Sequence, residues 1–259
     1  MLDFAQIKEY FPPQLAAVNP KGLLVEYLQY EFLDSLFKQT GSECLSFIGG
    51  TAIRIIHDSQ RFSEDLDFDN FGLNFPDFKN LLAKAIAEIK VKGFAVETRR
   101  LNKNMVYHAY IKFPNILQRL GLSSHREEKI FLSLDAQHKA KIFSPEIRPL
   151  NKFGVYRNIP VNPPEVLLSQ KLMAILGRKR EKGRDFYDAS FLRGKTRPDY
   201  SYIQTRTGLN REIFCDKLRK RCLSLNFKAL ADDVKPFLFD TAQLDRVLYF
   251  RENLDQILG

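Results

Sequence analysis

The stretch FIGGTAIRIIHDSQRFSEDLDFD, residues 47 to 69, constrains the fold of this chain more than any other segment. An apolar run ends in two glycines, a helix-like segment follows, and an acidic run then alternates with apolar residues. We predict a short buried strand in CLSFIGG and a helix opened by Thr51 in TAIRIIHD. The order is therefore strand, glycine turn and helix.

The glycine turn predicts a site for a phosphate chain. Gly49 and Gly50 would let a ligand approach the backbone closely, and the free amides at the start of the helix, at Thr51, favour an anion. A tight turn that requires a positive φ explains a lone glycine pair equally well. The residues that follow the helix decide how much weight the glycines carry.

The acidic run adds carboxylates to this turn. Asp65, Asp67 and Asp69 alternate with Leu66 and Phe68, which is the period of two expected of a half-buried strand, so we expect the three carboxylates to share one face. Two carboxylates at positions i and i+2 can hold Mg²⁺ through hard oxygen ligands. A solvated strand face is the alternative for an isolated acidic pair.

A third carboxylate, Asp135, closes the apolar run in KIFLSLDAQ, residues 129 to 137. With Asp65 and Asp67 it would complete a set able to bind one or two Mg²⁺ ions, activate an attacking hydroxyl and neutralise a leaving pyrophosphate, as nucleotidyl transfer requires. An aspartate that ends a strand can also be a plain turn former.

The remaining sequence predicts a mixed α/β architecture, α+β in its arrangement, followed by a helical region. Helical periodicity covers residues 22 to 38 and the segment after Pro76, and strands are expected over 94–101, 105–113 and 129–137. From about Pro163 the segments favour helices, including 210–225 and 241–257. We expect a first domain over 1–160 and a mostly helical second domain over 161–259.

The segment QKLMAILGRKREKGRDFYDASFL, residues 170 to 192, carries a second group of charged residues. Lys171 and Arg178 are seven residues apart and so lie on nearly one helical face, as do Asp185 and Asp188 at i and i+3. Lys171 could hold nucleotide phosphates as a point charge, and Arg178 could add a forked contact. Asp185 could position either of them or take part in activating the acceptor hydroxyl, which would make Lys171 and Asp185 catalytic residues. A solvated charged helix is the alternative if this segment is taken alone.

Composition favours a polyanionic partner and argues against three classes of protein: membrane-spanning, secreted and zinc-binding. The formal charge is +9, from 40 Lys and Arg against 31 Asp and Glu, which favours a polyanionic partner. The chain has no apolar run near the length of about 20 residues that a membrane span needs, and its N-terminus does not read as a signal peptide, so we expect a cytoplasmic protein without a membrane partner. Its three cysteines and four histidines are scattered, which argues against zinc.

Together these motifs resemble the nucleotidyltransferase superfamily, and within it the AbiEii/AbiGii-type toxins of abortive-infection systems. GGTA leads into the R-x-SEDLDF run at Arg61 to Phe68, and an Arg-Asp-x-x-Asp run follows at Arg184, Asp185 and Asp188. The specific motifs are confined to about 47–69 and 165–191, and residues after 200 match no known pattern.

The resemblance implies a nucleotidyltransferase that acts as the toxin of a toxin-antitoxin pair. It implies Mg²⁺ as cofactor, an NTP as donor, an RNA acceptor such as the 3′ end of tRNA, and a cognate antitoxin. In this reading metals bind Asp65, Asp67 and Asp135, with Asp135 alternatively acting as the base. Phosphate contacts come from the following residues: Gly49, Gly50, Thr51, Ser63, Lys171 and Arg178. The basic run GRKREKGR would suit an RNA backbone.

Two alternatives remain open at the level of sequence. The same chemistry could act on a small-molecule hydroxyl, such as that of an aminoglycoside, or on a protein hydroxyl. The chain could also be a nucleotide- or RNA-binding relative without activity, although the presence of all three carboxylates argues against loss of catalysis.

Overall fold

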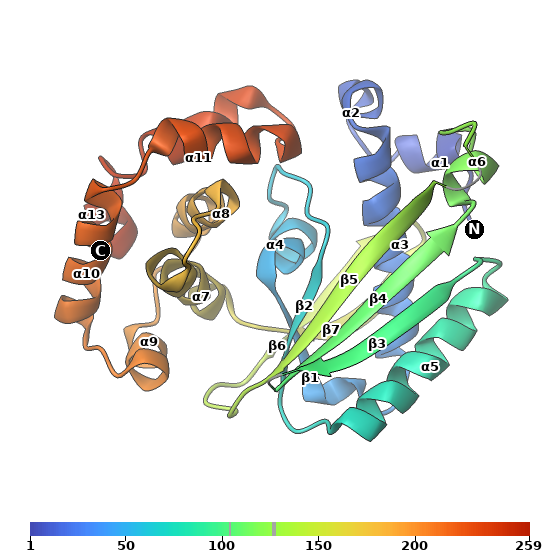
Figure 1. Ribbon diagram of the computed structural model, residues 1–259, viewed down its shortest axis with the longest axis horizontal. Helices are drawn as coiled ribbons and strands as arrows, with labels where there is room; N and C mark the ends of the chain where they lie inside the picture. The colour runs from blue at the N-terminus through green and yellow to red at the C-terminus, as the bar shows by residue number, and fades with distance from the viewer. Residues whose placement is uncertain (104, 126–127) are drawn as a thin grey trace. The chain divides into compact units, whose positions relative to one another are not determined.

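A computed structural model describes residues 1–103, 105–125 and 128–259. The chain divides into two compact units, one made of residues 1–56 and 62–161 and the other of residues 57–61 and 162–259. The first unit is built around a sheet, and the described residues of the second unit are mainly helical (Figure 1).

The first unit contains seven described strands and the helices around them. The elements are α1 (Phe4–Lys8), α2 (Pro13–Val18), α3 (Pro20–Phe37), η1 (Ser42–Cys44), β1 (Leu45–Ile48), α4 (Gly49–His57), β2 (Leu66–Asn70), α5 (Phe75–Val91), β3 (Glu97–Lys103), β4 (Val106–Pro114), α6 (Ile116–Arg119), β5 (Lys129–His138), β6 (Glu146–Lys152) and β7 (Val155–Val161). Each strand and helix predicted over residues 22–137 is therefore present, with shifted ends.

The strands form one mixed sheet in the order β3-β4-β5-β2-β1-β7-β6. β2 pairs in parallel with β5, and β1 with β7, while the other neighbours are antiparallel. The β6–β7 hairpin was not predicted, because Pro149 and the mostly exposed residues of β6 lack an apolar alternation. Proline fits this position, since β6 is an edge strand.

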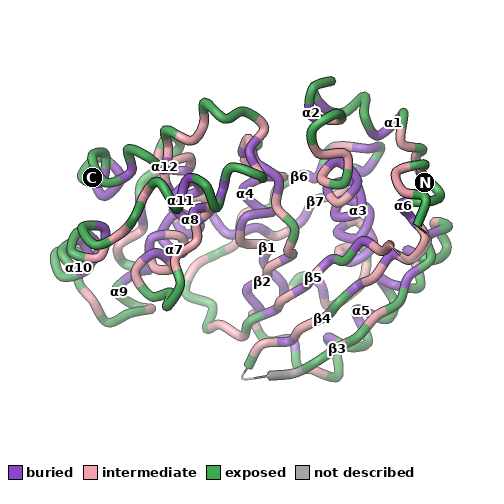
Figure 2. Tube along the Cα trace, turned by 45° about the horizontal axis from the view of Figure 1, so that its top comes forward, coloured by how far each residue is buried: buried purple, intermediate pink, exposed green. Residues whose placement is uncertain are grey.

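Helices α3 and α5 cover one face of the sheet. The ring of Phe37 on α3 contacts Phe68 of β2, and the rings of Phe75 and Phe78 on α5 contact Tyr107 of β4. Both helices begin with an asparagine side chain that caps the first turn and a proline within that turn. Burial is greatest along β1 and β2 and falls toward the exposed edge strand β3 (Figure 2).

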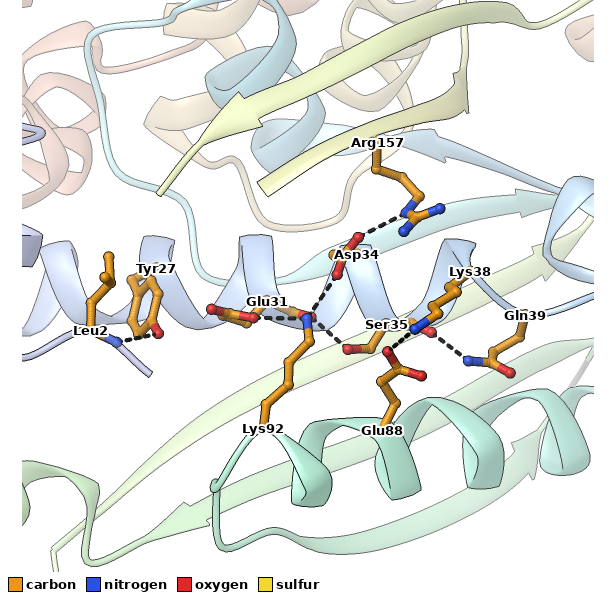
Figure 3. A network of polar contacts seen from close by, with 10 residues as sticks. All are labelled: Leu2, Tyr27, Glu31, Asp34, Ser35, Lys38, Gln39, Glu88, Lys92 and Arg157. Atoms are coloured by element: carbon orange, nitrogen blue, oxygen red, sulfur yellow. Dashed lines mark hydrogen bonds and ion pairs between the residues drawn. The ribbon is translucent and has the colours of Figure 1, made fainter. Parts of the chain in front are cut away.

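Charged side chains fasten α3 to its neighbours (Figure 3). Lys92, at the end of α5, lies 2.8 Å from carboxylate oxygens of both Glu31 and Asp34 on α3. Arg157 of β7 donates to the other oxygen of Asp34, also at 2.8 Å. The central helix is thereby tied to α5 and to the sheet by partly buried ion pairs as well as by apolar packing.

The second unit packs helices around a small aromatic core. It contains α7 (Pro164–Gly177), α8 (Gly183–Arg193), α9 (Tyr200–Thr207), α10 (Arg211–Leu223), α11 (Phe227–Val234), η2 (Lys235–Phe237), η3 (Thr241–Leu244), α12 (Asp245–Leu248) and α13 (Leu254–Leu258). The ring of Phe186 on α8 packs edge-on against Phe227 and Phe250. The predicted helical region is confirmed, but the helix expected over 241–257 is wrong, because three short helical segments occupy those residues.

Candidate active site

Five strands of the first unit align one residue each in a row across the sheet. Asp67 of β2 lies opposite Ile48 of β1 on one side and Asp135 of β5 on the other. Asp135 in turn lies opposite His108 of β4, and His108 opposite Leu101 of β3. Residues opposite one another point to the same face of a sheet. Asp67, Asp135 and His108 therefore share the face opposite to that covered by α3 and α5.

His108 contacts one of the two central carboxylates directly. Its Nδ1 atom lies 2.7 Å from Oδ1 of Asp135, and both side chains are partly exposed. The sequence analysis did not select His108, because its place beside Asp135 depends on the pairing of β4 with β5. Only a prediction of this strand register would have found it.

Gly49 lies against the carboxylate of Asp67. Its φ is +78°, and a β-carbon built on it would lie 2.3 Å from Oδ2 of Asp67. Any side chain at position 49 would therefore displace that carboxylate. The helix expected to open at Thr51 begins at Gly49 instead, because the positive φ of Gly49 ends the strand and α4 follows at once. Gly50 is buried in the first turn of α4.

The segment before β2 is held by two buried side chains from other elements. Thr51 donates its hydroxyl to the backbone carbonyl of Asp65, and Gln29 of α3 donates its amide to the carbonyls of Ser63 and Glu64 at 2.8 and 3.1 Å. These bonds fix the segment that carries Asp65 into the strand. Gln29 was not predicted, because nothing in the helical pattern of α3 distinguishes it from a surface glutamine.

The expected single acidic face needs one correction. β2 begins at Leu66, so Asp65 precedes the strand, whereas Asp67 and Asp69 lie within it and alternate with buried Leu66 and Phe68. Asp69 is itself fully buried opposite Ser46, while Asp67 is partly exposed. Burial of Asp69 leaves Asp67 as the strand carboxylate that a ligand can reach.

A buried ion pair joins α4 to α3. Arg54 on α4 donates to Glu26 of α3 through Nε at 2.9 Å and through Nη2 at 3.2 Å. Lys152 adds a contact of 2.7 Å to the same carboxylate. Two cations around one buried carboxylate hold the helix that starts at the glycine turn in a defined position. The sequence feature that could have indicated this ion pair is Glu26, a glutamate within the apolar run of α3.

In the second unit, charged residues of α7, α8 and the 57–61 segment form a buried network. Lys171 lies 3.1 Å from Asp185 and 2.8 Å from Asp188. Arg178 lies 2.9 Å from the second oxygen of Asp185. Arg61 binds Asp188 in a two-pronged contact with both distances 2.6 Å. Three cations surround two carboxylates, so the network carries an excess positive charge.

Burial and ion pairing act on the pKa values of this network in opposite directions. Burial would raise the pKa of the Asp188 carboxyl, but the charges of Arg61 and Lys171 outweigh it and hold the pKa below its usual range. Burial would likewise lower the pKa of Lys171, and Asp188 with Asp185 raises it instead. Lys171 and Asp188 therefore remain charged at neutral pH, and the ammonium group of Lys171 is held by Asp185 and Asp188.

The structure brings the predicted residues together in two groups. The first unit places Asp67 beside Asp135, Gly49 against Asp67, and Thr51 on the backbone of Asp65. The second unit joins Lys171, Arg178 and Asp185. Sequence analysis missed the following contributors: Gln29, Glu26, Arg54 and His108 in the first unit, and the ion pair of Arg61 with Asp188 in the second.

The carboxylate pair suits a divalent metal. Among the described residues, no three His, Cys, Asp or Glu side chains gather into a complete protein cage for a metal ion. Mg²⁺ does not require one, because proteins commonly hold it through one or two carboxylates while phosphates and water complete its shell. Asp67 and Asp135, side by side on parallel strands, provide such a pair. Metal binding by Asp65 stays a prediction.

Comparison with known proteins identifies the family. The family model described as nucleotidyl transferase AbiEii toxin, type IV toxin-antitoxin system, matches residues 31–253. The chain belongs to this family. This AbiEii protein is accordingly a nucleotidyltransferase toxin of a type IV toxin-antitoxin system, and the family implies an NTP donor, usually a divalent metal, and a cognate antitoxin. The specific motifs at about 47–69 and 165–191 both lie inside the matched region.

Solved structures share the fold of this AbiEii protein. MenT4, a nucleotidyltransferase toxin from Mycobacterium tuberculosis, superposes with a TM-score of 0.63 at 17% identity, covering 98% of this chain and 90% of that one. JHP933 from Helicobacter pylori gives a TM-score of 0.57 at 18% identity, covering 92% and 93%. No curated protein matches the chain in sequence. Within the described residues, no helix is long and apolar enough to cross a membrane.

Proposed function

We propose that this AbiEii protein transfers an NMP group from an NTP to a hydroxyl of RNA, with the 3′ end of tRNA as the acceptor. The observation that carries the proposal is the alignment of Asp67 with Asp135 on parallel strands, with Gly49 packed against the Asp67 carboxylate. Carboxylates placed in this way can bind a metal ion, and the adjacent glycine turn can bind the phosphates of a nucleoside triphosphate.

The donor nucleotide would lie at the turn between β1 and α4. The start of α4, at Gly49 and Gly50, offers backbone amides to the phosphates, and Thr51 with Gln29 keeps the neighbouring segment in place. We also expect phosphate contacts from Ser63, Lys171 and Arg178, whose side chain is 40% exposed. Asp185 positions Lys171 and Arg178 by accepting from both.

The carboxylates would hold Mg²⁺ and handle the proton of the acceptor. Asp67 and Asp135 would be the ligands, with Asp65 expected as a third, and bound Mg²⁺ would supply the charge that neutralises the phosphate oxygens. The acceptor oxygen forms a bond to the α-phosphorus as the bond to the β-phosphate oxygen breaks, and pyrophosphate leaves. In the alternative role of base, Asp135 would receive the hydroxyl proton. In either role His108 holds Asp135 in position through a 2.7 Å contact.

RNA is favoured as acceptor by the distribution of charge. The chain carries a formal charge of +9, and the loop between α7 and α8 exposes Lys179 and Arg180. Clustered cations bind the closely spaced phosphates of a nucleic acid and release its counterions. A small neutral acceptor would gain nothing from them.

The test is incubation of the protein with Mg²⁺, total RNA and each α-labelled NTP in turn. We expect label in a discrete RNA band of tRNA size with one or two of the NTPs. Asp67→Asn should lower the rate by at least about 100-fold, because it removes a charge at the reacting phosphates, and Asp232→Asn, an exposed aspartate of α11, is the matched control. An unchanged rate in Asp67→Asn would contradict the proposed site, and labelled protein or small molecule without labelled RNA would contradict the acceptor.

A further inference from the structure

The face of the sheet that carries the carboxylate pair continues over β3, β4 and β5 as a surface of aromatic and basic side chains. We call it the stacking face and define it by Arg99, Leu101, Tyr110, Lys112 and Phe131. Tyr110 is 40% exposed and Phe131 is 54% exposed. In contrast, the residues that alternate with them, such as Ile111 and Leu132, are fully buried against the helices.

Strand register places the stacking face next to the carboxylates. Tyr110 follows His108 by two residues on β4, and Phe131 precedes Asp135 by four on β5, so all four side chains lie on one face. Two residues along a strand span about 7 Å. Tyr110 therefore lies about 7 Å from the row of Asp135, and Phe131 about 13 Å from it.

Basic side chains accompany the two rings. Arg99 lies opposite Tyr110 in the β3–β4 register, and Lys112 lies opposite Phe131 in the β4–β5 register. The ammonium group of Lys112 is 5.6 Å from the centre of the Phe131 ring. Single exposed aromatic residues are common on protein surfaces, but two rings on adjacent strands, each with a cation, match the requirements of unpaired nucleotides, which offer flat bases and negative phosphates.

The position of the stacking face distinguishes the acceptor from the donor. The glycine turn follows β1, on one side of the carboxylate strands, whereas Tyr110 lies on β4, on the other side. In phosphoryl transfer the attacking and leaving oxygens lie roughly in line on opposite sides of the phosphorus. With the triphosphate at the β1 turn, the attacking hydroxyl approaches from the β4 side.

We infer that the stacking face binds the unpaired nucleotides at the 3′ end of the acceptor RNA and guides the terminal hydroxyl to Asp135. Tyr110 stacks on the base closest to the carboxylates and Phe131 on a preceding base, while Arg99 and Lys112 contact phosphates. This inference rests on the proposed transfer of nucleotides to RNA, and it adds the residues that select an unpaired end.

Direct binding tests the inference without requiring turnover. The full-length protein is titrated into a short single-stranded RNA of mixed sequence with a fluorescent 5′ label, and anisotropy gives the Kd. Tyr110→Ala and Phe131→Ala should each weaken binding about 5- to 150-fold, the range expected for loss of one stacked base. Tyr110→Phe keeps the ring and should bind as the parent does. ATP affinity, measured by calorimetry, should not change in any of these variants.

Tyr156→Ala is the matched control, because Tyr156 is an exposed tyrosine of the same sheet, on β7. Its RNA affinity should equal that of the parent, and circular dichroism should show that every variant is folded. Unchanged RNA affinity in both Tyr110→Ala and Phe131→Ala would overturn the inference. Loss of ATP affinity instead would also overturn it, by assigning the rings to the donor base, as would equally tight binding of a blunt RNA duplex.

The outcome of this experiment is separable from that of the nucleotide-transfer assay. Transfer to RNA with unchanged binding in the ring variants would leave the proposed function intact and remove the stacking face. Ring-dependent RNA binding without transfer by the parent would leave the stacking face as an RNA-binding surface and contradict the proposed enzyme reaction.

Discussion

At the scale of single residues, the contact between Gly49 and Asp67 leaves no room for a side chain at position 49. Gly49→Ala should lower nucleotide transfer by at least about 100-fold, because its β-carbon would lie 2.3 Å from the Asp67 carboxylate and displace it. The positive φ of +78° should add about 1–2 kcal/mol of destabilisation. Transfer of label and urea unfolding measure the two effects separately.

Gly154 provides the matched control for this substitution. It has nearly the same φ, +77°, but nothing lies within 4 Å of its added β-carbon. Gly154→Ala should therefore show the loss of stability without the loss of activity. Equal activity in the two alanine variants would mean that transfer does not depend on the position of the Asp67 carboxylate.

The same residues show how far sequence reasoning reaches into the site. Asp67 was predictable because its neighbours Leu66 and Phe68 supply a local alternation, and Gly49 because a glycine turn precedes a helix. The contact of His108 with Asp135 was not, because it joins strands whose register is set by long-range pairing. The bond from Gln29 to Ser63 links α3 to a loop 34 residues away and has no local signature.

At the scale of elements, the ion pairs that fasten α3 predict a dependence of stability on pH. Burial alone would raise the pKa of Asp34, but Lys92 and Arg157 lower it below its usual value of 3.8. The unfolded chain then binds a proton more readily than the folded protein does. The stabilisation is complete above about pH 4 and is lost as the pH falls through the lower pKa of the folded state.

Asp34→Asn removes this charge while keeping the shape of the side chain. It should lower the free energy of unfolding by about 1.5–3 kcal/mol at neutral pH, the range for a hydrogen bond to a charged group, and the difference from the parent should shrink below about pH 4. Urea unfolding across pH 3 to 8 measures it, with the exposed Asp232→Asn as control. A difference that stayed constant with pH would show that the charge of Asp34 is not its source.

The elements themselves were predictable in proportion to their local patterns. Helix α5 was found because Pro76 opens a regular apolar period. The hairpin of β6 and β7 was missed, since an exposed edge strand with Pro149 has no buried face to impose an alternation. The segment 241–257 was assigned one helix because its apolar residues recur, but Asp240 caps only a 3₁₀ turn and shorter segments follow.

At the scale of the whole molecule, the formal charge of +9 predicts how the reaction responds to salt. Cations such as the exposed Lys179 and Arg180, together with Arg99 and Lys112, would displace counterions from RNA when it binds. For about five phosphate contacts to a single strand, affinity should fall about 100-fold between about 50 and 200 mM salt. The kcat/KM for RNA should fall in parallel, because at low RNA concentration it includes the binding step.

The KM for the NTP provides the internal comparison, since a single triphosphate displaces few counterions and should respond far less to salt. Lys112→Gln should reduce the slope of log kcat/KM for RNA against log salt by about 0.7, the value for one phosphate contact on a single strand, and Tyr110→Ala should lower the rate without changing that slope. A kcat/KM that is flat across this range of salt would mean that the acceptor is not a polyanion, and the hydroxyl of a neutral small molecule would then account better for the acidic pair on β2 and β5.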